Sequence, residues 1–342
     1  MVEKSLIQVY MGSSDKFHFA PLGLGLRASG QNLHTLIICF APHKLMDAAI
    51  TASSILKPNL VIDHSAIEGM HIGEKFMKDK VLDSFQTAKN AALTGNFDIV
   101  ILNGVLQVMN QEIISLEDIL TLMGKKSDNV ELVFSGSSAP EDIIKKADLV
   151  TEMVEHGPTL KPEKENTARN KGTIEVITGN GKGKTTYCLG KAMLKSCLGT
   201  RSSILQFIKS PKPYGEVKAI EKFPLLEIRS MGEGFLDLYT TDPQKKHVDA
   251  ARQAWKECLK EIFSLKYGLV VLDEIDNAIH YGLVNPERVR EMLFLKPEKL
   301  SLILSGRNAH PAVMDAATTV IEMKEIKHPF TKGIKARMGI EF

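Results

Sequence analysis

Short hydrophobic runs alternate along the chain with longer segments of helical periodicity. In the second half the runs are apolar at consecutive positions, which is typical of strands buried on both faces. Strands are predicted there at 173–178, 201–207, 269–272 and 300–304, and helices at 184–198 and 242–265. Buried strands that alternate with helices indicate a mainly parallel sheet covered on both faces. The pattern therefore predicts a three-layer α/β/α fold.

The first half of the chain repeats the pattern of the second. Residues 7–40 align without a gap with residues 174–207, and residues 97–153 align in the same way with residues 267–323. Chance similarity rarely keeps one register for so long, so we infer two tandem copies of one domain.

A polar segment at 156–172, with two prolines and no apolar periodicity, separates the two copies. We interpret it as a linker between domains at 1–155 and 173–342. The chain has 342 residues, of which 44% are hydrophobic and 25% charged, so each domain has enough apolar residues for its own core.

A glycine-rich loop lies between the first predicted strand and helix of the second copy. It reads Thr178-Gly-Asn-Gly-Lys-Gly-Lys-Thr-Thr186, and its end, Gly183-Lys184-Thr185, matches a phosphate-binding P-loop. Glycines let backbone N–H groups converge on phosphate oxygens at a helix N-terminus, and Lys184 adds a positive charge. An ordinary glycine-rich turn is the alternative, which the flanking strand and helix disfavour. The predicted nucleotide-binding residues are Gly179, Asn180, Gly181, Lys182, Gly183, Lys184, Thr185 and Thr186.

Two acidic residues, Asp273 and Glu274, follow the apolar strand at 269–272. P-loop proteins hold Mg²⁺ beside the nucleotide with such acids and with the hydroxyl at the position of Thr185. A pair of solvated acids at a strand end is the alternative. With the glycine loop in the same domain, we predict a magnesium site made by Thr185, Asp273 and Glu274.

The first copy lacks these groups. In the alignment Lys16 stands at the position of Gly183, Phe17 at that of Lys184 and His18 at that of Thr185. Asn103-Gly104 replaces the two acids. The fold class predicted is therefore two tandem P-loop NTPase-like (RecA-like) domains, the first of them degenerate and unable to bind Mg-ATP.

Several separated motifs of the second copy together resemble one family, the P-loop ATP:corrinoid adenosyltransferases. They are GNGKGKTT, VVLDE, MGEGF at 231–235, Ser305-Gly306-Arg307 and the tail at 327–342. The resemblance covers 173–342. It implies transfer of the 5′-deoxyadenosyl group of ATP to the Co(I) centre of a reduced corrinoid, with release of triphosphate, in adenosylcobalamin biosynthesis or salvage.

The resemblance also implies roles for individual residues. Lys184, Thr185 and Glu274 are the expected catalytic residues. Arg307 follows a strand end, from which it either reaches the nucleotide or the corrinoid or is simply solvated. Family members displace the lower axial ligand of cobalt with two aromatic side chains; Phe235 matches the first, whereas Asp237 stands in the place of the second, usually Trp. Tyr239 is the candidate substitute, and a plain core role for Phe235 is the alternative.

Charge and the lack of targeting signals limit which partners and which cellular location we expect. Lys and Arg total 43 against 41 Asp and Glu, a net charge of +2 without a long basic stripe, so nucleic acid is not an expected partner. No signal peptide or apolar run of about 20 residues is present, and the four cysteines lack metal-site spacing, which favours a cytoplasmic protein with free thiols.

The family resemblance implies a flavin-type reductase as the electron donor. It also adds a homodimer, or an intramolecular pseudo-dimer in which the first copy takes the place of the partner.

Two other functions remain open at this point. The change at Asp237 and the degenerate first copy are compatible with a protein that binds nucleotide or corrinoid, or delivers adenosylcobalamin, without efficient catalysis. A P-loop kinase or ATPase that acts on another small molecule is the third possibility. The basic tail residues, Lys327, His328, Lys332, Lys335 and Arg337, either face the corrinoid or are simply solvated.

Overall fold

The computed structural model describes residues 5–12, 16–71, 75–157, 171–234, 245–329, 333–334 and 336–341. Within these ranges each copy contributes six strands to a single twelve-stranded sheet. The strands of the first copy are β1 (Ile7–Gly12), β2 (Thr35–Cys39), β3 (Leu60–Asp63), β4 (Ile99–Asn103), β5 (Glu131–Gly136) and β6 (Leu149–His156). Those of the second are β7 (Ile174–Thr178), β8 (Ser202–Gln206), β9 (Leu226–Ser230), β10 (Leu269–Asp273), β11 (Ser301–Ser305) and β12 (Thr319–Lys327).

The helices follow the same duplication. The first copy has α1 (Phe19–Ser29), α2 (Met46–Leu56), α3 (Lys78–Thr94), α4 (Val105–Asn110), α5 (Leu116–Lys125) and α6 (Glu141–Lys146). The second has α7 (Lys184–Cys197), α8 (Gly215–Ile220), α9 (Lys245–Phe263), α10 (Ile275–His280), α11 (Pro286–Leu295) and α12 (Pro311–Met314). The tandem α/β fold class predicted from the repeats is confirmed.

The strand order shows how the two copies join. It runs β3-β2-β4-β5-β1-β6-β12-β7-β11-β10-β8-β9, so the second half of the order mirrors the first. Strands within each copy are parallel, and only β6 and β12 pair antiparallel. Met153 lies opposite Met323, its own counterpart in the repeat. The copies are therefore related by an approximate two-fold rotation through this pair, and the two predicted sheets form one.

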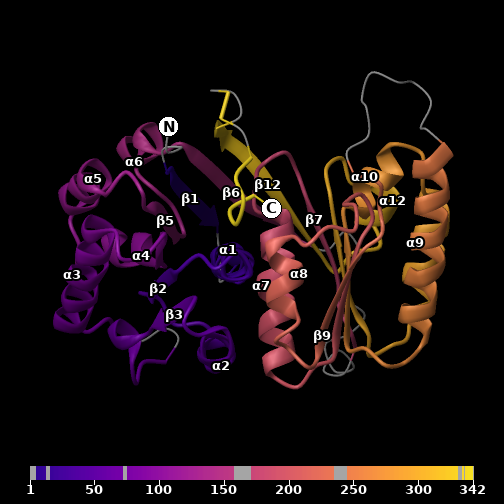
Figure 1. Ribbon diagram of the computed structural model, residues 1–342, viewed down its shortest axis with the longest axis horizontal. Coiled ribbons are helices and arrows are strands. Elements are labelled where there is room, and N and C mark those ends of the chain that lie inside the picture. Colours follow the sequence, from indigo (N-terminus) through magenta and orange to yellow (C-terminus); the bar gives the residue numbers. More distant parts are fainter. Residues whose placement is uncertain are drawn as a thin grey trace.

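Helix α1 of the first copy and helix α7 of the second cross and pack against each other where the two copies meet (Figure 1). Each carries a glycine at the crossing. A Cβ atom on Gly23 would lie 1.8 Å from the carbonyl oxygen of Thr186, and one on Gly190 would lie 2.2 Å from that of Phe19. The repeat therefore preserves this glycine because any larger residue would push the two backbones apart.

The hydrophobic core is shared between the copies. Apolar side chains of α1 and α2 pack with those of α7 and α8 in one cluster, which includes Leu22, Leu26, Leu189 and Met193. A second cluster fills the opposite face of the second copy beneath α9, which Figure 1 shows on the far side of the sheet from α7. The first copy thus covers one face of the second.

The predicted element boundaries differ from the observed ones by a few residues. The helix predicted at 184–198 ends at Cys197, and the long helix predicted at 242–265 is described over Lys245–Phe263. Residues 158–170, most of the predicted linker, lie outside the described residues. No helix in the described part of the chain is both long and apolar enough to cross a membrane.

Candidate active site in the second copy

The glycine loop connects β7 to α7 and runs against β12. Gly179 and Gly183 have φ of +96° and +109°, a conformation that side chains disfavour. A Cβ atom on Gly179 would lie 2.4 Å from the carbonyl oxygen of Met323, which accepts a 2.7 Å hydrogen bond from the N–H of Gly181. Backbone conformation and close approach together require glycine, as in a phosphate-binding loop.

Lys184 begins α7, and its side chain turns back into the loop. Its Nζ donates hydrogen bonds to the carbonyl oxygens of Gly179, at 2.6 Å, and Gly181, at 2.7 Å. Burial and the nearby Arg307 lower the pKa of Lys184 to about 8. The ammonium group therefore lies where the loop would surround a phosphate.

The next residue, Thr185, meets the end of β10. Its hydroxyl donates to Asp273 at 3.1 Å, and the hydroxyl of Ser305 donates to the same Asp273 oxygen at 2.6 Å. The Gln206 amide donates to the other carboxylate oxygen at 3.0 Å. Asp273 is fully buried, so this network fixes its orientation at the ends of three neighbouring strands. The structure thus brings together the hydroxyl and the first acid that the sequence predicted as neighbours.

Glu274 follows with a left-handed backbone, φ +62°, at the position where the first copy has Gly104, φ +84°. A side chain in this conformation is uncommon and marks a position of interest. Burial and the neighbouring Asp273 raise the pKa of Glu274 to about 7. Its Oε2 is buried and accepts no hydrogen bond from the described residues.

These oxygens fit a magnesium ion. Mg²⁺ in nucleotide sites needs only one or two carboxylates, because phosphates and water complete the octahedron. No cluster of three or more His, Cys, Asp or Glu residues suited to a metal occurs in the described part of the chain. The hydroxyl of Thr185, the carboxylate of Asp273 and the orphaned oxygen of Glu274, the three groups predicted from the sequence, would hold the ion with a nucleotide.

A third acid, Asp276, was missed in the sequence. Both of its carboxylate oxygens are buried and have no hydrogen-bond partner among the described residues. Burial raises its pKa to about 7. Leu106 occupies the equivalent position in the first copy. The replacement of a buried leucine by an acid was the signal that could have identified it, because an unpaired buried carboxyl group is costly.

The other predicted residues have mixed placements. The side chain of Arg307 is exposed at the mouth of the site. Its backbone N–H donates a hydrogen bond to Asn277 Oδ1 at 2.9 Å. The hydroxyl of Thr186 donates to the carbonyl of Gly183, and Asn180 is exposed at the loop tip. Lys182 pairs at 3.0 Å with the carboxylate of Glu341.

The predicted corrinoid-facing residues are not tested by the structure. Phe235, Asp237 and Tyr239 lie outside the described residues. In the tail, Lys327 donates to backbone carbonyls at the end of α6, and Arg337 pairs with Glu131. These two tail residues therefore bind the first copy, whereas Lys332 and Lys335 also lie outside the described part.

Aromatic side chains stand in the first copy at the positions equivalent to Lys184 and Thr185. Phe17 is fully buried, and its ring centroid lies 4.2 Å from that of His18, which lies 4.6 Å from that of His43. His18 Nδ1 is 3.2 Å from Asn103 Oδ1, which reproduces the Thr185 to Asp273 contact with uncharged partners. Burial lowers the pKa of His18, so the ring stays neutral. The absence of Mg-ATP binding here stays a prediction, which this packing supports.

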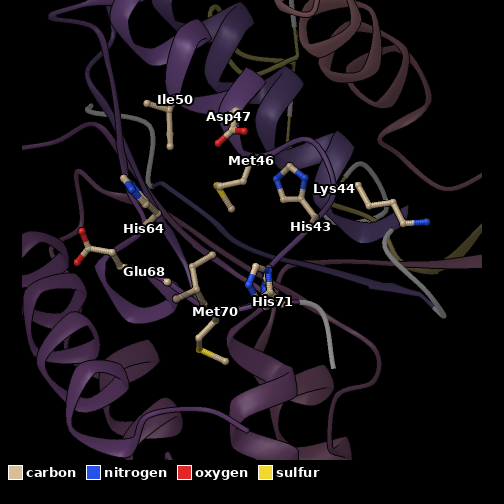
Figure 2. A pocket seen from close by; sticks show the side chains of 12 residues that line it. His43, Lys44, Met46, Asp47, Ile50, His64, Glu68, Met70 and His71 are labelled. Atoms are coloured by element: carbon tan, nitrogen blue, oxygen red, sulfur yellow. The ribbon is translucent and has the colours of Figure 1, made fainter. Parts of the chain in front are cut away.

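A cavity of about 470 Å³ lies after the carboxyl ends of β2 and β3, and His43 is among the residues that line it. Figure 2 shows His43, His64 and His71 around it, with Met46 and Met70 between them. His43 thus contacts the ring of His18 and also lines this cavity.

A mainly parallel sheet, a glycine loop that leads from β7 into a helix, and an acid at the end of β10, two strands away from β7, define the class. This is a tandem P-loop α/β protein with one intact and one degenerate loop.

Comparison with known proteins gives the family. The sequence model of ATP:corrinoid adenosyltransferase BtuR/CobO/CobP matches the chain twice, at 3–167 and 170–342. The chain therefore belongs to the ATP:corrinoid adenosyltransferase family, and the resemblance seen in its motifs is confirmed.

The similar proteins differ in how much of this chain they match. A corrinoid adenosyltransferase of Pseudomonas aeruginosa is 34% identical over 193 residues, which are 56% of this chain and 94% of that protein. One of Escherichia coli K12 is 34% identical over 174 residues, 50% of this chain and 86% of that protein. An uncharacterised protein of Nostoc sp. PCC 7120 is 26% identical over 341 residues, 94% of this chain and 89% of that protein. The Nostoc protein thus has similarity along nearly the whole duplicated chain, whereas the two enzymes match about half of it.

Proposed function

We propose that this protein transfers the 5′-deoxyadenosyl group of ATP to the Co(I) centre of a reduced corrinoid, with its active site in the second copy. The observation that carries the proposal is a pair of neighbouring contacts: Lys184 donates hydrogen bonds into the glycine loop, and the next residue, Thr185, donates one to Asp273. The names of the relatives in Pseudomonas and Escherichia coli support the same reaction.

The proposed chemistry needs no general base from the protein. Co(I) supplies the electron pair of the new Co–C bond, the bond from C5′ to oxygen breaks, and triphosphate leaves with its electrons. Catalysis then consists of holding ATP in line and stabilising the leaving group. The loop N–H groups and Lys184 do so for the phosphates. Mg²⁺, held by Thr185, Asp273 and Glu274, would neutralise further charge on the triphosphate.

The corrinoid side of the proposal rests on the family resemblance. Phe235 and Tyr239 are proposed to contact the lower face of the corrin ring, with Asp237 in the place of the usual second aromatic residue. A flavin-type reductase as electron donor and a cytoplasmic setting also remain parts of the proposal, as does cob(I)alamin as the substrate.

The test is an anaerobic assay with chemically reduced cob(I)alamin and ATP. Formation of the Co–C bond is followed in the visible spectrum, and triphosphate is assayed in parallel. Replacing Lys184 by Ala should lower kcat/KM for ATP at least about 100-fold, because the charge opposite the leaving group is lost. Alkylation by the variant at the parental rate at limiting ATP would contradict the proposal.

The same assay separates the alternative functions. Bound but unreacted corrinoid would identify a binding or delivery protein, which the Asp237 change favours. Orthophosphate or a phosphorylated acceptor would identify a P-loop ATPase or kinase.

A further inference from the structure

The end of the chain returns from the second copy to the first and is held there by a buried ion pair. The guanidinium of Arg337 donates to both carboxylate oxygens of Glu131 on β5, at 2.8 and 2.9 Å. The two side chains are 9% and 2% exposed. Glu131 also accepts a 2.7 Å hydrogen bond from the N–H of Leu6, so its orientation is fixed by the first copy.

This ion pair continues to the glycine loop of the second copy. Arg337 lies 3.3 Å from Oε1 of Glu341, and its backbone N–H donates to Oε2 at 2.8 Å. The same Oε1 pairs with Nζ of Lys182 at 3.0 Å. A chain of four charged side chains, Glu131, Arg337, Glu341 and Lys182, therefore links β5 of the first copy to the loop.

The first copy contacts the loop and the tail at three further points. The hydroxyl of Thr151 on β6 donates to the carbonyl of Lys182 at 3.0 Å. The ring of Tyr10 on β1 approaches Gly183 so closely that a Cβ atom there would lie 3.0 Å from its Cε1. Arg27 on α1 donates to the carbonyls of Ile340 and Glu341, at 3.1 and 2.9 Å.

The residues that make these contacts differ between the two copies. The repeat alignment places Ile177 opposite Tyr10, Leu194 opposite Arg27, Ser301 opposite Glu131 and Ile321 opposite Thr151. The copy without an intact phosphate loop thus has polar or aromatic groups at the positions that touch the loop of the other copy or the tail that is paired with that loop. Since a buried ion pair rarely stabilises a fold more than an apolar pair would, its use here indicates a demand for fixed geometry.

We propose that the first copy positions the phosphate loop of the second, and that Glu131 is a positioning residue acting through Arg337, Glu341 and Lys182. A glycine-rich loop loses conformational freedom when it closes on phosphates. Anchoring it beforehand reduces that cost and raises the affinity for nucleotide. The proposal rests on nucleotide binding by the second copy, as in the proposed function, but not on the corrinoid reaction.

The test is direct titration of the full-length protein with Mg-ATP in the absence of corrinoid, followed by calorimetry. Glu131→Gln should raise the Kd for ATP at least about tenfold, and Thr151→Val, which removes only the hydroxyl contact, should raise it severalfold. Glu131→Asp should restore part of the affinity. In the adenosylation assay KM for ATP should rise while KM for the corrinoid stays within twofold.

The matched control is Glu175→Gln. Glu175 forms a similarly buried ion pair with Lys191 at 2.6 Å within the second copy, and among the described residues it accepts its side-chain hydrogen bonds from Lys191 and from neither the loop nor the tail. This variant should lose thermal stability without changing the Kd for ATP. Equal effects of Glu131→Gln and Glu175→Gln on ATP affinity, or unchanged affinity in both Glu131→Gln and Thr151→Val, would overturn the proposal. Failure of the corrinoid reaction with intact ATP binding would instead overturn only the proposed function.

Discussion

At the residue scale, the two copies carry different chemistry on the same backbone. Asp273 and Asn103 each accept a hydrogen bond from an equivalent serine, at 2.6 and 2.7 Å. Glu274 and Gly104 share the left-handed conformation that ends the strand. The fold therefore tolerated the loss of charge in the first copy because the hydrogen-bond geometry was retained.

Glu216 offers a test of residue-scale electrostatics. It is fully buried between Arg27, at 3.0 Å, and Lys209, at 2.5 Å. Burial alone would raise the pKa of Glu216. The two cations lower it by more than burial raises it, so the pKa falls from the ordinary 4.5 to about 2. Since the folded-state pKa is depressed, the carboxylate contributes stability above pH 4.5, and this contribution is lost as the pH falls toward 2.

We therefore expect the stability difference between the parent and Glu216→Gln to be constant above pH 4.5. Below that pH the parent should lose its advantage in unfolding free energy over the variant, by up to about 3 kcal/mol, which is the free energy equivalent of the pKa shift. Urea unfolding of both proteins at several pH values from 2 to 7 measures this difference. A difference that does not change with pH would show that the ion pairs do not control this carboxyl group.

At the element scale, the crossing of α1 and α7 fixes the position of the helix that begins with Lys184. Alanine is normally preferred to glycine inside a helix by about 1 kcal/mol. At Gly23 the added methyl group would meet backbone atoms of Thr186 and Gly190, which cannot rotate away. The clash should therefore outweigh the helix preference.

We expect Gly23→Ala to destabilise the protein by about 1–3 kcal/mol or more. It should also weaken ATP binding, since α7 must shift. Gly124→Ala in α5 is the control, because its nearest neighbour is the flexible end of Lys146, at 3.2 Å. That variant should be neutral or slightly stabilising in thermal unfolding; a similar loss in both variants would contradict the role of the crossing.

At the scale of the whole molecule, the two copies form one folding unit. The sheet is continuous through β6 and β12, and the core between α1, α2, α7 and α8 contains side chains from both copies. Removing the first copy exposes an unpaired strand edge and the apolar face of α7. Exposed edges and large apolar patches favour association.

Residues 171–342 expressed alone should therefore form dimers or larger assemblies rather than a stable monomer. Size-exclusion chromatography with light scattering measures the mass, and Mg-ATP titration measures the affinity. A monodisperse monomer with the parental affinity for ATP would show that the first copy is dispensable, and would also contradict its positioning role.

The sequence by itself determined the duplication, the α/β class, the strand, glycine loop and helix, and the degeneration of the first copy. These features are local: each depends on residues within one repeat, where hydrophobic periodicity and glycine spacing are visible in a short window. The meeting of Thr185 with Asp273 was also predictable, since the carboxyl ends of parallel strands share one edge of the sheet.

Only the tertiary structure decided how the copies join and where the tail lies. The pairing of Met153 with Met323 and the contact of Glu131 with Arg337 leave no periodic signal in the sequence. They depend on the packing of segments that are far apart in the chain, and a charged residue has the same local pattern whether it is solvated or buried. The position of the first copy against the nucleotide loop is therefore a property of the folded molecule.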